Sequence, residues 1–240
     1  MIPFLSLPGV RRFERFFNLD VALRYLPIAD RLAGGTAGRL LEVGSGNRGL
    51  AAYLPERVIG VEPRPTVAAV PCLRPVAATG TALPFATRSF DTVVSVDVLE
   101  HLPAAERPRF LEELVRVAAR RVVLAFPAGT RAAAHDRSLA DRYRRLRGTL
   151  DQSLAEHLEH GLPDAEPVRQ AIERSARRPV AVRVERNLNL SVRRWIMHRW
   201  MSPTVLDLAL YRLAALLIPF RRWLNFGPCY RVIMDVSLGG

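Results

Sequence analysis

The 240-residue chain lacks lysine altogether, has only two cysteines and has no long apolar run. The two cysteines, Cys72 and Cys229, cannot supply the disulfide framework of a secreted domain, so we expect a reducing, cytoplasmic setting. The apolar start, residues 1–7, has no basic segment before it and is too short for the core of a signal peptide. The sequence therefore predicts no secretion signal.

The absence of lysine makes arginine the source of all 35 basic charges, and the net charge is +12. After residue 130 the chain holds 19 arginines against 11 acidic residues, so the excess is larger in the second half. A basic half can meet phosphates, an anionic membrane or an acidic substrate, but an arginine-rich solvated surface explains it equally well. Charge alone does not choose a partner.

A glycine-rich turn follows the first apolar run of the chain. Residues 40–43 predict a buried parallel strand, and Gly44 and Gly46 let the backbone turn sharply and approach a ligand. A helix expected to begin near Asn47 would point free N–H groups at that ligand. The next apolar run ends at Glu62, whose carboxylate can accept hydrogen bonds from ribose hydroxyls at the tip of the neighbouring strand. This pattern predicts a nucleoside-containing cofactor.

Strand and helix patterns alternate along the first half of the chain. A parallel sheet with helices on both sides is therefore expected. The predicted strands are 73–78, 91–97, 121–126, 180–185 and 230–236, and the predicted helices are amphipathic segments in 10–32, a short helix through Val70, a helix from Pro108 and polar helices in 131–178.

Four motifs in register resemble class I S-adenosylmethionine (SAM) methyltransferases of the small-molecule branch, methyltransferase type 11. They are Glu42-x-Gly-x-Gly46, Leu83-Pro-Phe85, residues 89–94 and Val98-Leu-Glu-His101. The resemblance implies an α/β fold with a doubly wound, mostly parallel, seven-stranded Rossmann-like sheet and an antiparallel edge strand. It also implies SAM as the cofactor.

The same resemblance divides one domain, residues 1–240, into three parts. Residues 1–38 are expected as a helical cover, 39–128 as the cofactor-binding core, and 129–240 as a helical insertion or lid that carries the last two strands. The implied cofactor-binding residues are Glu42, Gly44, Ser45, Gly46, Glu62, Thr79, Gly80, Leu83 and Asp97. Thr79 departs from the family, which usually places an aspartate there for the adenine amino group.

The acceptor is predicted to be a small molecule or a lipid. Methyltransferases that act on nucleobase amino groups carry an Asn or Asp-Pro-Pro-aromatic tetrapeptide where this chain has Asp97-Val-Leu-Glu100, so a nucleic-acid partner is disfavoured. If the acceptor is a hydroxyl, a general base helps. His101 is the best-placed candidate, with His135 and His157 behind it, although His101 could equally cap the following helix.

Glu156, His157 and His160 fall on one helix face. A metal site would need further ligands and a firmer spacing, so no metal is expected. The face is read either as part of a substrate pocket or as a solvated polar surface.

The three tryptophans, Trp195, Trp200 and Trp223, lie in the segment 191–224 beside arginines. The apolar stretch 203–220 within it is too polar to span a membrane, which takes about twenty apolar residues. Two interpretations stay open. The segment is an interfacial helix that makes peripheral contact with the inner membrane face, or a lid helix with a buried apolar side.

The sequence thus predicts a SAM-dependent methyltransferase with a small-molecule or lipidic acceptor. One alternative is a catalytically silent SAM-binding module, which the departure at Thr79 keeps open. The other is an NAD-dependent oxidoreductase, which the glycine spacing disfavours. The acceptor and the oligomeric state are not fixed by the sequence.

Overall fold

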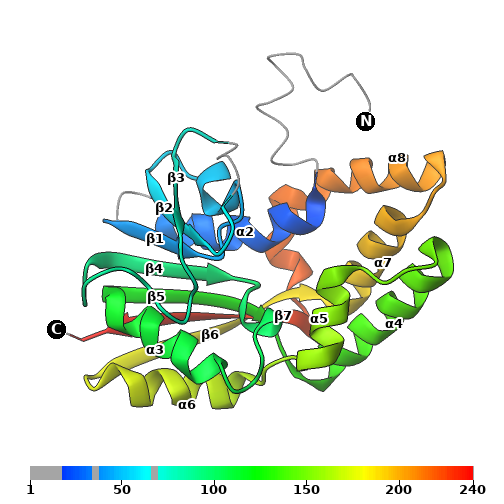
Figure 1. Cartoon of the computed structure of the whole chain (residues 1–240). Helices are drawn as coiled ribbons and strands as arrows, with labels where there is room; N and C mark the ends of the chain where they lie inside the picture. Colours follow the sequence, from blue (N-terminus) through cyan, green and yellow to red (C-terminus); the bar gives the residue numbers. More distant parts are fainter. Residues whose placement is uncertain (1–17, 34–37, 66–69, 240) are drawn as a thin grey trace.

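The computed structural model describes residues 18–33, 38–65 and 70–239. The helix predicted before residue 18, the linker at 34–37 and most of the short helix before Val70 lie outside these ranges. One seven-stranded sheet lies at the centre of the described structure, and the helices pack around it (Figure 1).

The described strands form a seven-stranded sheet in the order β3-β2-β1-β4-β5-β7-β6. Strands β1 to β5 run parallel, whereas β7 runs antiparallel to both of its neighbours. The predicted mostly parallel, doubly wound sheet is therefore confirmed, with the antiparallel strand one place inside the edge. The strands are β1 Leu40–Val43, β2 Val58–Glu62, β3 Leu73–Ala77, β4 Phe90–Val96, β5 Ala118–Pro127, β6 Val180–Asn189 and β7 Cys229–Leu238.

Two apolar cores cover the two faces of the sheet because successive side chains of a strand point to opposite sides. Leu41 and Val93 face α3 (Arg107–Val117) and α6 (Ala165–Ala176). Leu40 and Val94, each one residue away, face α2 (Leu19–Leu32) instead. Central strands buried on both sides read as continuous apolar runs, which is why they were recognised from the sequence.

The remaining helices gather beyond the end of the sheet toward which β4 points (Figure 1). The polar segment after residue 128 is helical as predicted, and no helix among the described residues is long and apolar enough to cross a membrane. These elements are α4 Gly129–Arg147, α5 Gln152–His160, α7 Leu190–Met201, α8 Val205–Leu213 and the 3₁₀ segment η4 Ala214–Leu224.

The helix predicted to begin near Asn47 is wrong. The chain turns there and forms only a four-residue 3₁₀ helix, η2 (Gly49–Ala52). Gly49 has φ +47°, which interrupts right-handed helical geometry, and the Glu42 carboxylate accepts the N–H of Leu50 at 2.7 Å. The Leu50 N–H is therefore paired with Glu42 and is not free to bind a ligand.

Candidate active site

The sheet register brings the predicted cofactor residues to one edge. Val43 pairs with Val61 on β2 and with Ser95 on β4, so the carboxyl ends of these strands lie side by side. The glycine turn, Glu62 and Asp97 all follow directly. In parallel α/β sheets, ligands bind at this edge, where the strand order reverses.

The two glycines of the turn have different surroundings. Gly44 has φ +85° and donates its N–H to the Val61 carbonyl at 2.8 Å, and a Cβ added to it would overlap the Val98 side chain. Gly46 has φ +54° and donates its N–H to Glu62 Oε2 at 3.2 Å, but a Cβ there would meet no described atom within 4 Å. Ser45 between them is buried. The turn is packed at its start and open at Gly46.

Glu42 lies fully buried beneath the turn. Its Oε2 accepts the Leu50 N–H, and a Cβ added to Gly49 would overlap the same carboxylate. Burial raises the pKa of Glu42 to about 7, against the lowering effect of the Leu50 N–H. In this structure Glu42 supports the turn from below, and a direct contact with a cofactor stays a prediction.

The three predicted residues Thr79, Gly80 and Leu83 follow β3, whose last residue, Ala77, pairs with Glu62. Thr79 is exposed and its hydroxyl accepts that of Thr81 at 3.3 Å. Gly80 is packed so closely on Phe110 that a Cβ would overlap the ring. Leu83 is buried and its N–H bonds to Glu113 at 2.8 Å. Of the three, only Thr79 presents a polar side chain at the surface.

Asp97, at the carboxyl end of β4, belongs to a network of buried charges. Its carboxylate accepts two contacts from Arg231 Nε at 2.8 and 2.9 Å, and Arg24 Nε lies 3.2 Å away. Arg231 also lies 3.4 Å from Asp20. Although burial opposes ionisation, Arg231 and Arg24 hold the pKa of the Asp97 carboxyl below its usual value. Asp97 is therefore anionic and firmly held.

Two of the three predicted bases come together and the third does not. His101 and His157 have ring centroids 4.8 Å apart. Burial, and then the neighbouring His157, lower the pKa of His101, so its imidazole is neutral near pH 7. His135 is buried against Arg193, with 3.0 Å between Nδ1 and Nη1, and does not line the cavity described below.

Residues 41–126 match the family profile described as a methyltransferase domain. By sequence, this segment resembles a methyltransferase domain. The match spans β1 to β5 and so includes the glycine turn, Glu62 and Asp97. No curated protein sequence matches the chain significantly.

Solved structures resemble the whole fold at low sequence identity. The YcgJ protein from Bacillus subtilis has a TM-score of 0.55 and 18% identity over 90% of this chain and 97% of that one. A SAM-dependent methyltransferase from Thermotoga maritima has a TM-score of 0.56 and 16% identity over 95% and 99%. Phosphoethanolamine N-methyltransferase 2 from Haemonchus contortus, in complex with S-adenosylhomocysteine, has a TM-score of 0.54 and 13% identity. The alignment covers 98% of this chain and 59% of that one. These likenesses establish the fold.

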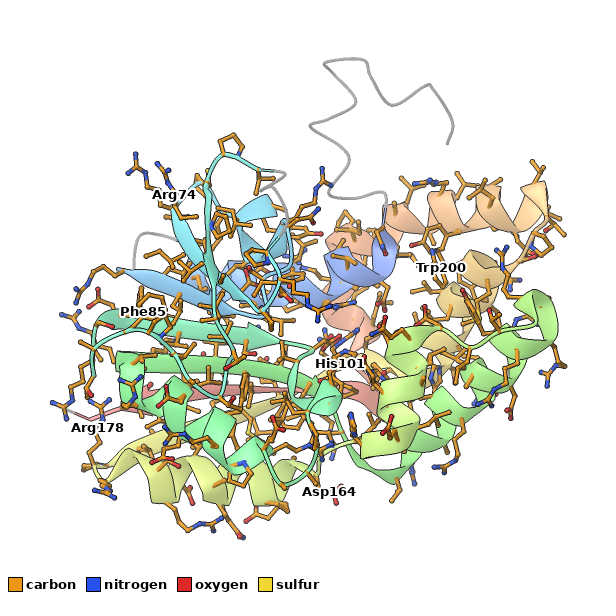
Figure 2. The ribbon with its side chains drawn as sticks, viewed as in Figure 1. Arg74, Phe85, His101, Asp164, Arg178 and Trp200 are labelled. Carbon is orange, nitrogen blue, oxygen red and sulfur yellow. The ribbon has the colours of Figure 1, made fainter. Side chains whose placement is uncertain are left out.

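A cavity of about 240 Å³ lies between the carboxyl end of β4 and the helices beyond the sheet. In Figure 2, His101 lies where the end of the sheet meets these helices, with Trp200 further out. The cavity wall is charged and aromatic. It includes Asp20, Arg24, Asp97, Glu100, His101, Tyr143, His157, Arg193, Trp200, Tyr230 and Arg231.

Most residues of the cavity wall could not be predicted as a group from the sequence, because they lie far apart in the chain. Arg231 lies 134 residues from Asp97 and 211 from Asp20, and no local sequence spacing predicts such pairs. Glu100 could have been found from the sequence, since it adjoins His101 in the motif Val98-Leu-Glu-His101. An acidic residue near the start of a helix is, however, usually interpreted as a helix cap. Asp136, which bonds to His157 at 2.8 Å, sits next to His135 in the sequence and was overlooked in the same way.

Proposed function

We propose that the protein is a SAM-dependent methyltransferase that acts on a small, polar acceptor. The observation that carries the proposal is the junction between turn and cavity. Val98 packs against Gly44 of the turn, while Asp97, the residue before it, lines the cavity. A cofactor on the turn and an acceptor in the cavity would therefore be neighbours.

The residues at the sheet edge fit a SAM molecule. Gly46 leaves its backbone open where a side chain would stand, and Glu62 presents a carboxylate at the tip of the adjacent strand, suited to ribose hydroxyls. The Haemonchus neighbour binds S-adenosylhomocysteine on the same fold. SAM would supply a methyl group on a positively charged sulfur, and methyl transfer is an in-line displacement.

For such a displacement the protein mainly aligns the acceptor and excludes water. Arginines and carboxylates of the cavity wall would hold a charged acceptor, and Trp200 would shield it. If the acceptor is a hydroxyl, His101 or His157 would take its proton. A cavity of about 240 Å³ is small for a ligand site, so a lipidic acceptor would enter by its head group only.

The test is transfer of labelled methyl groups from SAM to a fractionated extract of polar metabolites. We expect label in a small charged product. SAM binding without transfer to any fraction would favour the silent binding module. Label confined to nucleic acid would contradict the proposed acceptor class.

We also propose peripheral membrane contact through residues 191–224. The favouring observation is the exposed apolar side of α8 and η4, where Val205 is 83% and Trp223 76% exposed. Their opposite side packs on α2 through Tyr211 and Ile218. A lid with its apolar side buried does not account for this exposure, whereas an interfacial helix with nearby arginines does.

A flotation assay with anionic and neutral vesicles tests this contact. We expect binding to anionic vesicles that weakens as salt rises, because each basic residue near the surface contributes about 1 kcal/mol. Trp223→Ser should reduce flotation without loss of stability, since the side chain is exposed. Absence of the protein from the floated anionic fraction at low salt would contradict the proposal.

A further inference from the structure

We propose that Glu100, His101 and His157 form a binding site for a divalent transition-metal ion. One candidate ligand atom from each residue lies within 4.8 Å of the others. Glu100 and His101 belong to η3 (Leu99–His101), which follows β4, and His157 belongs to α5. The site thus joins the methyltransferase domain to the helical half, and all three residues line the cavity.

Glu100 has a buried carboxylate without a hydrogen-bond partner in the described part of the chain. Glu100 is 1% exposed, and neither of its oxygens has a hydrogen-bond partner among the described residues. His157 Nε2 is likewise buried without a partner in the described part of the chain, and it lies 4.0 Å from Glu100 Oε1. Buried polar atoms are nearly always paired, because leaving them unpaired costs free energy. A cation between these atoms would pair both.

The two imidazoles are each held by a carboxylate on one ring nitrogen. His101 Nδ1 is bound to Glu156 at 2.6 Å and His157 Nδ1 to Asp136 at 2.8 Å. Asp136 is fixed in turn by the Tyr230 hydroxyl at 2.8 Å. Metal-binding histidines usually have one ring nitrogen on a carboxylate, which orients the ring and leaves the other nitrogen for the ion. Both histidines here have that arrangement.

The ligand types indicate the class of ion. Two imidazoles and one carboxylate suit Zn²⁺ and related transition metals, whereas Mg²⁺ and Ca²⁺ prefer oxygen ligands only. Tetrahedral bonds of about 2.0–2.2 Å place ligand atoms about 3.5 Å apart, so binding would draw these side chains together by about 1 Å. Three protein ligands leave a fourth position free, on the cavity side.

Any role of the ion in methyl transfer rests on the proposed function. An imidazole that binds a metal cannot also take the acceptor's proton. Methyl transfer that persists after metal removal would show that the ion is not needed for transfer, and transfer that depends on the metal would assign the two imidazoles to the ion. The binding of the ion itself is measured separately.

The experiment uses the full chain, freed of metal by a chelator and titrated with Co²⁺ as a spectroscopic probe. We expect one Co²⁺ per chain with visible d–d absorption bands, displaced by Zn²⁺ and not by Mg²⁺. Glu100→Gln and His157→Gln should each weaken Zn²⁺ binding at least about tenfold. His160→Gln, one turn further along α5 and outside the cluster, is the matched control and should leave binding unchanged.

Absence of saturable Co²⁺ binding would overturn the proposal, as would binding that Glu100→Gln and His157→Gln leave intact. Circular dichroism checks that each variant is folded. If His157→Gln fails to fold, Glu100→Gln decides, because it keeps the shape of the side chain and removes its charge. SAM titrations of the same variants separate the two proposals, since metal binding without SAM binding would contradict only the proposed function.

Discussion

The two sides of the active site differ in the chemical groups that they present to a ligand. On the side of the glycine turn, β1 and β2 present backbone groups and one carboxylate, with Gly44 and Gly46 in left-handed conformations. On the other side, the end of β4, α2 and β7 present paired charges such as Asp97 and Arg231. The first side depends on where the chain can turn, and the second on which distant residues meet.

This difference bears on specificity. A turn of glycines accepts a cofactor common to a whole family, because it recognises the ligand through the backbone. A wall of buried charges is particular to one chain, since each charge must be matched by a partner or by the acceptor. Substitutions on the charged side should therefore cost more stability than substitutions in the turn.

The largest expected effect is on the charged side, in Arg231→Met. Arg231 is 1% exposed and neutralises both Asp97 and Asp20, so its loss leaves buried carboxylates without their main partner. We expect a loss of about 3–5 kcal/mol in the free energy of unfolding, measured in urea. The matched control is Arg121→Met, which breaks the more accessible pair with Asp235 and should cost about 1 kcal/mol. Equal costs would remove the contrast between the two sides.

The next largest effect separates the two glycines. Gly44→Ala places a Cβ against Val98 in a left-handed conformation and should cost about 2–4 kcal/mol. Gly46→Ala has the same backbone strain without the overlap and should cost about 1 kcal/mol. Thermal unfolding of both variants provides the comparison. A less stable Gly46 variant would mean that the turn is packed differently.

The raised pKa of Glu42 predicts that the stability of the protein without cofactor depends on pH. Its pKa is about 7 when folded and about 4.5 as the ordinary value, so unfolding releases a proton between these pH values. Stability should fall as pH rises from about 4.5 to 7, by about 3 kcal/mol in total, and then level off. Glu42→Gln keeps an acceptor for the Leu50 N–H and should abolish this fall. A variant that retains the same fall would assign it to another group.

The last of these effects concerns affinity rather than stability. Glu62→Ala removes the carboxylate expected to accept the ribose hydroxyls, in charge-assisted bonds worth roughly 1.5–3 kcal/mol each. SAM affinity should fall at least about tenfold, and adenosine affinity should fall comparably. If only ligands that retain the methionine part lost affinity, Glu62 would lie at the other end of the cofactor.

The same contrast explains what the sequence could predict. Buried strands such as β4 can be predicted from continuous apolar runs. The glycine turn can be predicted because its backbone conformation requires glycine. The 3₁₀ helix at Gly49 was missed because a buried glutamate seven residues earlier controls it. The pairing of His157 with Asp136, and of Arg231 with Asp97, follows from helix packing and strand order, which no local pattern encodes.

Direct titration of the protein with SAM in a calorimeter tests the central claim that the turn and Glu62 bind this cofactor. The account predicts saturable binding of SAM by the wild-type chain, no measurable binding by a folded Gly46→Val variant, and no preference for NADH. Tighter binding of NADH than of SAM, or unchanged SAM affinity in Gly46→Val, would contradict it.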